Sequence, residues 1–171
     1  NFPCTWTEPK PLGFLASSSF LNVVIDKNNA IFALWPKHDA ESINIYANHY
    51  AQQAGWQVAQ NLDIEASIGS SDNVEIATDA KGNAFAAWYR FDGTVNNIWF
   101  SQYIKNQGWQ NPVLLQSDCD CAHPQIATVK GGGVIVAWSQ LEEDGSFGIY
   151  IRQLSEEGVW ASRVKIAEVE D

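Results

Sequence analysis

The sequence is short of positive charge and contains no long hydrophobic run. Its ten Lys and Arg residues stand against twenty Asp and Glu residues, which gives a net charge of −10. A surface of that sign repels phosphate backbones. No apolar stretch approaches the ~20 residues that a membrane-spanning helix needs. We therefore expect neither a nucleic-acid partner nor insertion into a membrane.

Targeting features are also scarce. The sequence begins at Asn1, without Met and without a signal-like segment, so either the N-terminus was processed or the chain is a piece of something longer. Three Cys in an acidic, Lys-poor chain favour an exported protein, at the cell surface, outside the cell or in a periplasm. The absence of any Asn-x-Ser/Thr triplet neither supports nor excludes secretion.

What the chain does have is aromatic residues arranged in an internal repeat. Eight Trp, eight Phe and five Tyr accompany many turn-forming residues, a composition typical of strands and turns. Trp35, Trp88 and Trp138 recur at intervals of 53 and 50 residues. A second series, each member behind a glycine, follows 21 or 22 residues later at Trp56, Trp109 and Trp160. Two registers with one period indicate three copies of an approximately fifty-residue unit.

Each copy has the pattern of a four-stranded meander. In the middle copy an apolar run over 74–77 precedes a turn at 79–83, a strand that ends at Trp88, an alternating strand over 97–103 and a fourth strand at Trp109. No helical period interrupts the copies. Asp26 and Asp79 are expected to stabilise the first turn through side-chain to backbone hydrogen bonds.

Such a sheet has two faces to bury, and radial stacking of copies covers both, so the pattern favours a β-propeller over the alternative, a β-sandwich. We assign residues 1–171 to one all-β repeat domain with four-stranded antiparallel blades over 20–63, 73–117 and 123–169. Residues 3–16 resemble the fourth strand at Trp109 and are assigned to an orphan outer strand. Three blades are fewer than a closed propeller has. A homo-oligomer, a partner chain or flanking sequence is expected to complete the ring.

The repeat resembles a known family. Residues 76–88 read Ile-Ala-x-Asp-x-x-Gly-Asn-Ala-x-Ala-x-Trp, and this pattern is similar to bacterial sialidase-like propeller repeats. Residues 155–160 resemble a degenerate Asp-box with Glu157 in place of the usual Asp. The resemblance implies a propeller with this box on the hairpin between the third and fourth strands of a blade. It specifies fold rather than activity, because propellers serve as enzymes, lectins and scaffolds.

The residues of sialidase chemistry are not apparent. The resemblance implies three converging Arg, a Tyr–Glu pair and an Asp acid, whereas Arg90, Arg152 and Arg163 fall at positions that are not equivalent in the repeat. We expect these arginines to be solvated. We therefore expect no catalytic residues, no enzymatic activity and no cofactor. The recurring tryptophans are expected to pack the blades rather than to stack on sugars.

Candidate ligand contacts lie in the loops between the second and third strands. These loops align on one face of a propeller, where ligands could bind. A solvated polar loop and a carboxylate pair for glycoside hydrolysis are the competing interpretations. The acidic residues in question are Asp39, Glu41, Asp92, Glu143 and Asp144.

The cysteines divide into a close pair and a distant one. The spacing of Cys119, Cys121 and His123 matches no zinc knuckle, so a disulfide or free thiols at 119 and 121 are favoured over a metal site. Cys4 begins an outer strand, and a strand of eight residues separates its two ends by roughly 25 Å. We expect Cys4 not to pair with either within one ring, and it becomes a candidate for an intermolecular bond.

The main hypothesis is a non-catalytic binding or assembly module of an exported bacterial protein, with a protein or glycan ligand at the propeller loops. A glycan-binding lectin and a degenerate sialidase-like glycoside hydrolase are the alternatives.

Overall fold

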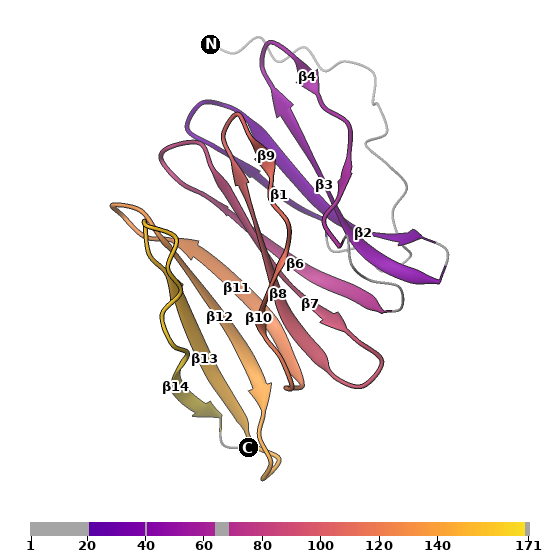
Figure 1. Ribbon diagram of the computed structural model, residues 1–171, viewed down its shortest axis with the longest axis vertical. Coiled ribbons are helices and arrows are strands. Elements are labelled where there is room, and N and C mark those ends of the chain that lie inside the picture. Colours follow the sequence, from indigo (N-terminus) through magenta and orange to yellow (C-terminus); the bar gives the residue numbers. More distant parts are fainter. Residues whose placement is uncertain (1–20, 40, 64–68, 170–171) are drawn as a thin grey trace.

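The protein is described by a computed structural model, which defines residues 21–39, 41–63 and 69–169. All fourteen secondary-structure elements assigned in these ranges are β-strands (Figure 1). Among the same residues, none forms a helix with the length and apolar character to cross a membrane. The all-β class expected from the sequence is therefore confirmed.

The strands follow one another as three copies of one unit. The first comprises β1 (Asn22–Ile25), β2 (Ile31–Asp39), β3 (Ser42–Ala51) and the short β4 (Gly55–Trp56) and β5 (Gln60–Asn61). The second comprises β6 (Ser70–Thr78), β7 (Ala84–Phe91), β8 (Asn96–Ile104), β9 (Gly108–Trp109) and β10 (Val113–Gln116). The third comprises β11 (Cys121–Thr128), β12 (Val134–Leu141), β13 (Phe147–Leu154) and β14 (Val164–Val169).

Within each copy the long strands pair antiparallel in chain order, and the short strands at the end of the first two copies pair with β3 or β8. The strands of different copies therefore do not interleave. In the described residues, one parallel bridge, Ile43 to Ser70, joins the first copy to the second, and the third forms a separate sheet. The sheets are open rather than closed on themselves.

The first turn of each of the first two copies is held by an aspartate. Asp26 Oδ1 accepts hydrogen bonds from the backbone N–H groups of Asn28 and Ala30, each at 2.8 Å. Asp79 Oδ1 accepts the equivalent pair from Lys81 and Asn83 at 2.8 Å. Short acidic side chains in these turns satisfy backbone donors that the strands leave free. The predicted role of both residues is confirmed.

The first strands of the second and third copies begin before the expected boundaries of 73 and 123. β6 starts at Ser70 and β11 at Cys121, and the register of each shifts at an irregularity. Asn73 (φ 52°) and His123 (φ 51°) occupy the left-handed region at these irregularities. A bulge lets a strand continue past one unpaired residue, and the sequence pattern does not reveal that continuation.

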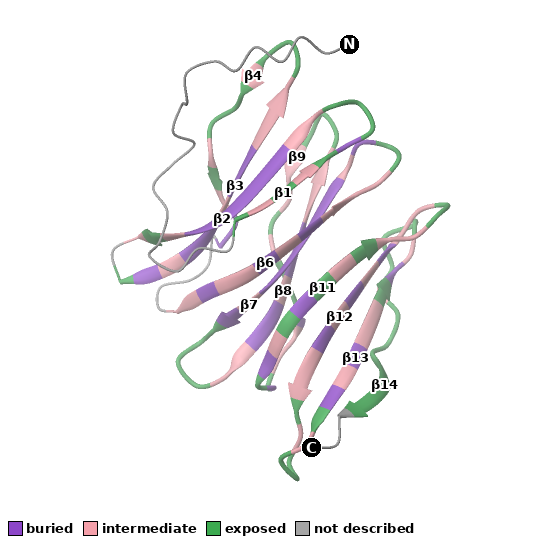
Figure 2. Ribbon diagram, turned by 180° about the vertical axis from the view of Figure 1, so that it is seen from behind, coloured by how far each residue is buried: buried purple, intermediate pink, exposed green. Residues whose placement is uncertain are grey.

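Two hydrophobic cores fill the spaces between successive copies. One joins the first copy to the second and contains Phe32, Ile45 and Trp88; the other joins the second to the third and contains Phe100 and Trp138. Figure 2 shows the buried segments concentrated on β2, β3, β7 and β8. The central copy is thus covered on both faces.

The first tryptophan series is core, as predicted, because Trp35, Trp88 and Trp138 are fully buried. The same prediction is wrong for Trp56, which is exposed on the two-residue strand β4 and has Tyr50 as an edge-on aromatic neighbour. Trp109 and Trp160 are half-buried. Trp109 and Trp160 each meet a phenylalanine of the preceding copy edge-on, Phe32 and Phe100, whereas in the described residues no copy precedes that of Trp56.

Side-chain hydrogen bonds connect the first strands of successive copies, β1, β6 and β11. Asn22 Nδ2 donates to Glu75 Oε2 at 2.8 Å, and Thr128 Oγ1 donates to the backbone oxygen of Thr78 at 3.1 Å. These bonds connect the first strand of each copy to that of the next.

Adjacent leucines on β10 offer a test of the second core. Leu115 is 3% exposed and Leu114 is 46% exposed. We expect Leu115→Ala to lower the free energy of unfolding by about 2–5 kcal/mol, because it leaves a cavity, and Leu114→Ala to change it by less than about 0.5 kcal/mol. Urea unfolding monitored by tryptophan fluorescence measures both, and equal losses would contradict this packing.

Candidate ligand-binding site

The turns between the second and third strands lie along one edge of the molecule. In Figure 1 the β2–β3, β7–β8 and β12–β13 hairpins all point toward the lower right or bottom of the view. These turns carry the five acidic residues singled out in the sequence. The shared edge is the arrangement expected of them.

Two of the five carboxylates hold their own hairpins. Asp39 accepts a hydrogen bond from the Tyr46 hydroxyl at 2.5 Å and one from Lys37 Nζ at 2.8 Å. Asp92 accepts bonds from the backbone N–H of Thr94 at 2.9 Å and from Asn97 Nδ2 at 2.7 Å. Both carboxylates lie four residues after a core tryptophan, so they are equivalent in the repeat.

The third carboxylate at this repeat position is Glu142, which belongs to the same acidic run but is not among the five predicted ligand contacts. Glu142 Oε1 accepts a hydrogen bond from the Tyr150 hydroxyl at 2.6 Å and lies 3.5 Å from Lys165 Nζ. Its position four residues after Trp138 was the signal that could have identified it.

The Tyr150–Glu142 contact has an equivalent in the first copy of the repeat. The hydrogen bond to Glu142 raises the pKa of Tyr150, and partial burial raises it further. The same tyrosine–carboxylate contact recurs in the first copy between Tyr46 and Asp39. The pair therefore belongs to the packing of the repeat.

A cleft of about 470 Å³ opens beside the β12–β13 turn. Of the five predicted residues, Glu143 and Asp144 line it, while Asp39, Glu41 and Asp92 do not. Its lining residues are Asp118, Gln140, Leu141, Glu142, Glu143, Asp144, Arg163, Lys165 and Glu168. The structure thus adds two cations and an amide that no sequence pattern had marked.

Hydrogen bonds and a cation–π contact with neighbouring side chains hold the charged groups of the cleft in place. Arg163 Nη1 donates to Gln140 Oε1 at 3.1 Å, and its guanidinium lies 5.0 Å from the centre of the Tyr150 ring. Lys165 Nζ donates to Glu168 Oε1 at 2.9 Å. Glu143 is exposed and faces the cleft beside these groups. Carboxylates that accept and cations that donate can together bind a ligand rich in hydroxyl groups.

The expectation that the arginines are solvated is wrong for Arg90. This residue lies two positions after Trp88 on β7, so both side chains point to the same face, toward the first copy. Arg90 Nη1 lies 3.6 Å from Asp63 Oδ2, and both side chains are almost completely buried. Trp88 Nε1 donates to the other oxygen of Asp63 at 2.9 Å. Arg90 therefore serves the contact between the first and second copies.

The three arginines do not share a binding point. Arg152 donates from Nε to the backbone oxygen of Ala161 and from Nη1 to that of Leu115, each at 2.8 Å. Arg163 faces the cleft, and Arg90 is buried between copies. Each guanidinium is engaged in a different local contact.

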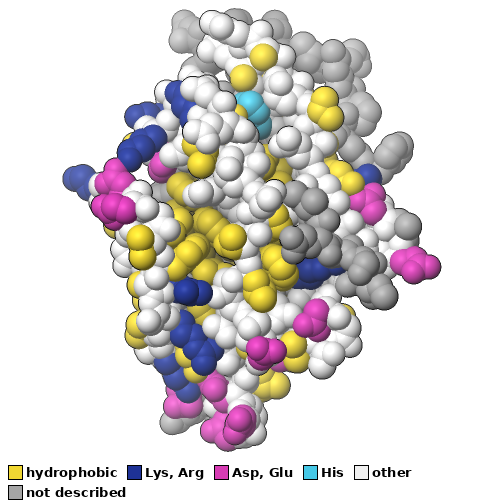
Figure 3. All heavy atoms as spheres, viewed as in Figure 1, with side chains coloured by type: hydrophobic (Ala, Val, Ile, Leu, Met, Phe, Trp, Pro, Cys, Tyr) yellow, Lys and Arg dark blue, Asp and Glu magenta, His cyan; other side chains and the backbone are white. Residues whose placement is uncertain are grey.

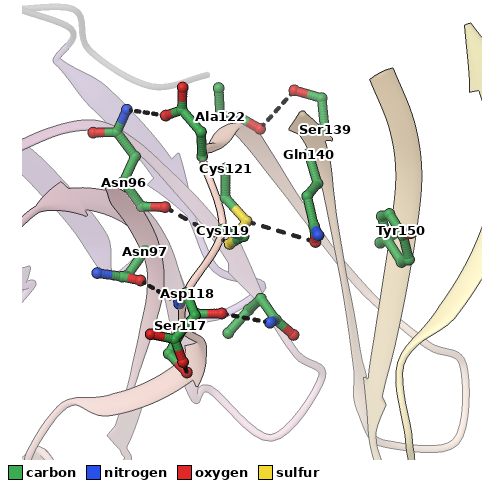
Figure 4. The surroundings of a disulfide bond; sticks show 12 residues. Asn96, Asn97, Ser117, Asp118, Cys119, Cys121, Ala122, Ser139, Gln140 and Tyr150 are labelled. Atoms are coloured by element: carbon green, nitrogen blue, oxygen red, sulfur yellow. Dashed lines mark hydrogen bonds between the residues drawn. A yellow bond between two sulfur atoms is a disulfide. The ribbon is translucent and has the colours of Figure 1, made fainter. Parts of the chain in front are cut away.

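The cysteine cluster lies on the link between the second and third copies. The structure joins Cys119 and Cys121 in a disulfide with a Cα–Cα distance of 5.2 Å (Figure 4). Asn96 Nδ2 donates to Asp120 at 2.9 Å, and the N–H of Asp118 donates to Asn97 at 3.0 Å. In the described ranges, no three His, Cys, Asp or Glu residues are grouped so that they could hold a metal ion. Cys4 and the strand predicted over 3–16 lie outside those ranges.

A second depression, of about 250 Å³, lies at the rim between the second and third copies. Trp160 and Phe100 form its aromatic part, and Gln102, Gln110 and Asn111 supply amides. Figure 3 shows hydrophobic side chains gathered in a hollow between the third sheet and the outer strands of the second copy.

Comparison with known proteins supports the fold. No family model and no curated protein matches the sequence. The solved structure "Hadza microbial sialidase Hz136" is similar over 86% of this chain, with a TM-score of 0.63 and 10% sequence identity. The chain spans 37% of the length of that protein. At this identity the likeness shows a sialidase-like all-β fold and nothing finer, and no comparison confirms the Asp-box repeat.

The hairpin carboxylates predict acid sensitivity. Partial burial works to raise the pKa of Asp39, but hydrogen bonds from Lys37, Tyr46 and Asn44 outweigh it and hold that pKa below its usual value. Backbone hydrogen bonds lower the pKa of Asp92. A lowered pKa in the folded state stabilises the protein above the unfolded pKa near 4, and this contribution disappears as pH falls through the folded pKa.

We therefore expect the melting temperature to fall as pH decreases from about 5 to 2, with a shallower fall in the Asp39→Asn/Asp92→Asn double variant. Calorimetry across this range measures the slopes, and parallel curves for the two proteins would contradict the assignment.

The buried ion pair predicts a large loss on truncation. Asp63→Ala leaves the Arg90 charge buried without its partner, and we expect a loss of about 3–5 kcal/mol in unfolding free energy. The double variant Asp63→Leu/Arg90→Met should lose less, because no buried charge remains. The exposed Glu41→Ala is the control. Equal stability of Asp63→Ala and the control would refute the burial of this pair.

Proposed function

We propose that the chain is a non-catalytic binding module of an exported bacterial protein, and that it contacts a neutral saccharide through the cleft beside the β12–β13 turn. The observation that carries this proposal is the composition of the cleft. Exposed Glu143 stands there beside Arg163 and Lys165, so hydrogen-bond acceptors and donors face one opening. The carboxylates of the cleft outnumber its cations, which disfavours an acidic sugar.

The absence of catalysis is part of the proposal. Three arginines engaged in separate contacts do not provide the converging grip on a carboxylate that sialidases use. The tyrosine–carboxylate contact is a repeated packing feature rather than a unique constellation. Oxyanion or carboxylate stabilisation requires preorganised donors aimed at one point.

We further propose that the three copies are blades of a partial ring. The self-contained antiparallel pairing of each copy and the bonds between first strands support this arrangement. A homo-oligomer or a larger parent chain would complete the ring.

The second candidate function is also saccharide binding, as a lectin, but in the rim depression rather than in the cleft beside the β12–β13 turn. Trp160 offers an aromatic face and Gln102, Gln110 and Asn111 offer amides, a combination that suits sugars. The Arg152 guanidinium lies 5.7 Å from the Trp160 ring. A degenerate glycoside hydrolase rests on the Asp-box resemblance alone.

Binding measurements separate these candidates. A glycan array should give hits among neutral saccharides, and calorimetric titration of the best hit should show Glu143→Gln binding at least about tenfold more weakly, because it loses a charge-assisted hydrogen bond. Glu41→Gln, on the equivalent turn of the first copy, should bind as the natural chain does. Loss of binding in Asn111→Ala alone would place the site in the rim depression.

The same preparation should release no product from sialyl or neutral aryl glycosides. Hydrolysis above the buffer blank would contradict the non-catalytic assignment, and an array without hits would contradict the saccharide ligand.

A further inference from the structure

One face of the third copy repeats the apolar positions of the internal seams, but in the described residues no further copy packs on it. In the first two copies, five repeat-equivalent apolar positions are buried against the following copy, and none is more than 7% exposed. They are Phe32, Leu34, Ile45, Ala47 and Leu62 in the first copy and Phe85, Ala87, Ile98, Phe100 and Leu115 in the second.

The third copy keeps these positions apolar but does not bury them. Along β12, Val134, Val136 and Trp138 are buried against the second copy, while the alternate residues Ile135 and Ala137 are only half-buried. Figure 2 shows this alternation along β12 and the exposed β14 at the edge of the same sheet, next to β13. We call the equivalent set, Ile135, Ala137, Ile149, Ile151 and Ile166, the open seam; its last member is 56% exposed.

The opposite end of the chain has an exposed strip of the complementary kind. Val74 and Ile76 on β6 pack against the first copy and are buried. Their equivalents on β1, Leu21 and Val23, are 53% and 51% exposed. On β2, Ala33 and Trp35 are already buried, so the exposed part of this face of the first copy is β1.

We infer that the open seam docks onto β1 of a second copy of this chain, head to tail. The inference rests on the proposed blade arrangement and names the partner that completes it. A contact of this kind is already made twice within each chain. In the new contact the receiving part is limited to β1, because Ala33 and Trp35 on β2 are already buried. Two arcs of three blades make six, within the four to eight blades of closed propellers. A two-fold axis would make the contact twice and close the ring.

Light scattering on the purified chain tests this. We expect a species of twice the 19.0 kDa chain mass. Ile151→Lys on the open seam and Val23→Lys on β1 should each weaken the dimer by about 100-fold or more, because a charge is buried without a partner. Val58→Lys, at an 86% exposed site outside both surfaces, should leave it unchanged. Circular dichroism and melting curves establish that each variant folds.

Mixing the two disrupted variants gives a sharper test. In a head-to-tail ring, a pair of one Ile151→Lys chain and one Val23→Lys chain keeps one intact contact, so the mixture should dimerise more strongly than either variant alone. A face-to-face dimer of two open seams would instead be insensitive to Val23→Lys and would overturn the inference.

A folded monomer at all concentrations, or a dimer that survives Ile151→Lys, would overturn it as well. Saccharide binding by such a monomer would leave the proposed function standing, because the cleft beside the β12–β13 turn lies within one chain.

Discussion

The structure depends on one constraint, which is that a four-stranded sheet with two apolar faces must be covered on both. The middle copy satisfies it, since every residue from Ala84 to Trp88 on β7 is buried. The third copy is covered on one face, and its β12 alternates between buried and half-buried residues. The same sequence pattern thus gives two burial patterns, according to the neighbours that each copy has. Hydrophobic burial between copies, rather than within one, organises the molecule.

Much of this fold was predictable because the repeat is visible in two tryptophan registers. The turns at Asp26 and Asp79 and the buried Trp35, Trp88 and Trp138 follow from local chemistry that recurs in each copy. The starts of β6 and β11 did not follow, since a bulge leaves no period in the sequence. Trp56 shows a further limit, because equivalent positions at the rim of the sheet are not equally covered.

The candidate site was only partly predictable. The sequence predicted that these turns share one face of the molecule, but it chose Glu143 rather than Glu142 as a ligand contact, although the spacing from Trp138 marks Glu142 as the equivalent of Asp39 and Asp92. It also could not foresee that Arg163 and Lys165, from the far side of the last hairpin, would line the same cleft. The Asp63–Arg90 pair joins two copies across 27 residues, and no motif of either residue predicts that meeting. Such contacts depend on the three-dimensional packing of one copy on the next.

The disulfide between Cys119 and Cys121 encloses a single intervening residue. Closing so short a loop removes only about 1.6 kcal/mol of chain entropy from the unfolded state, so the bond adds little through that route. It acts as a local brace on the linker and does not cross-link the two sheets that this linker joins. Cohesion between those sheets is consequently non-covalent, and oxidation of the thiols fixes the path of the linker rather than the angle between its neighbours.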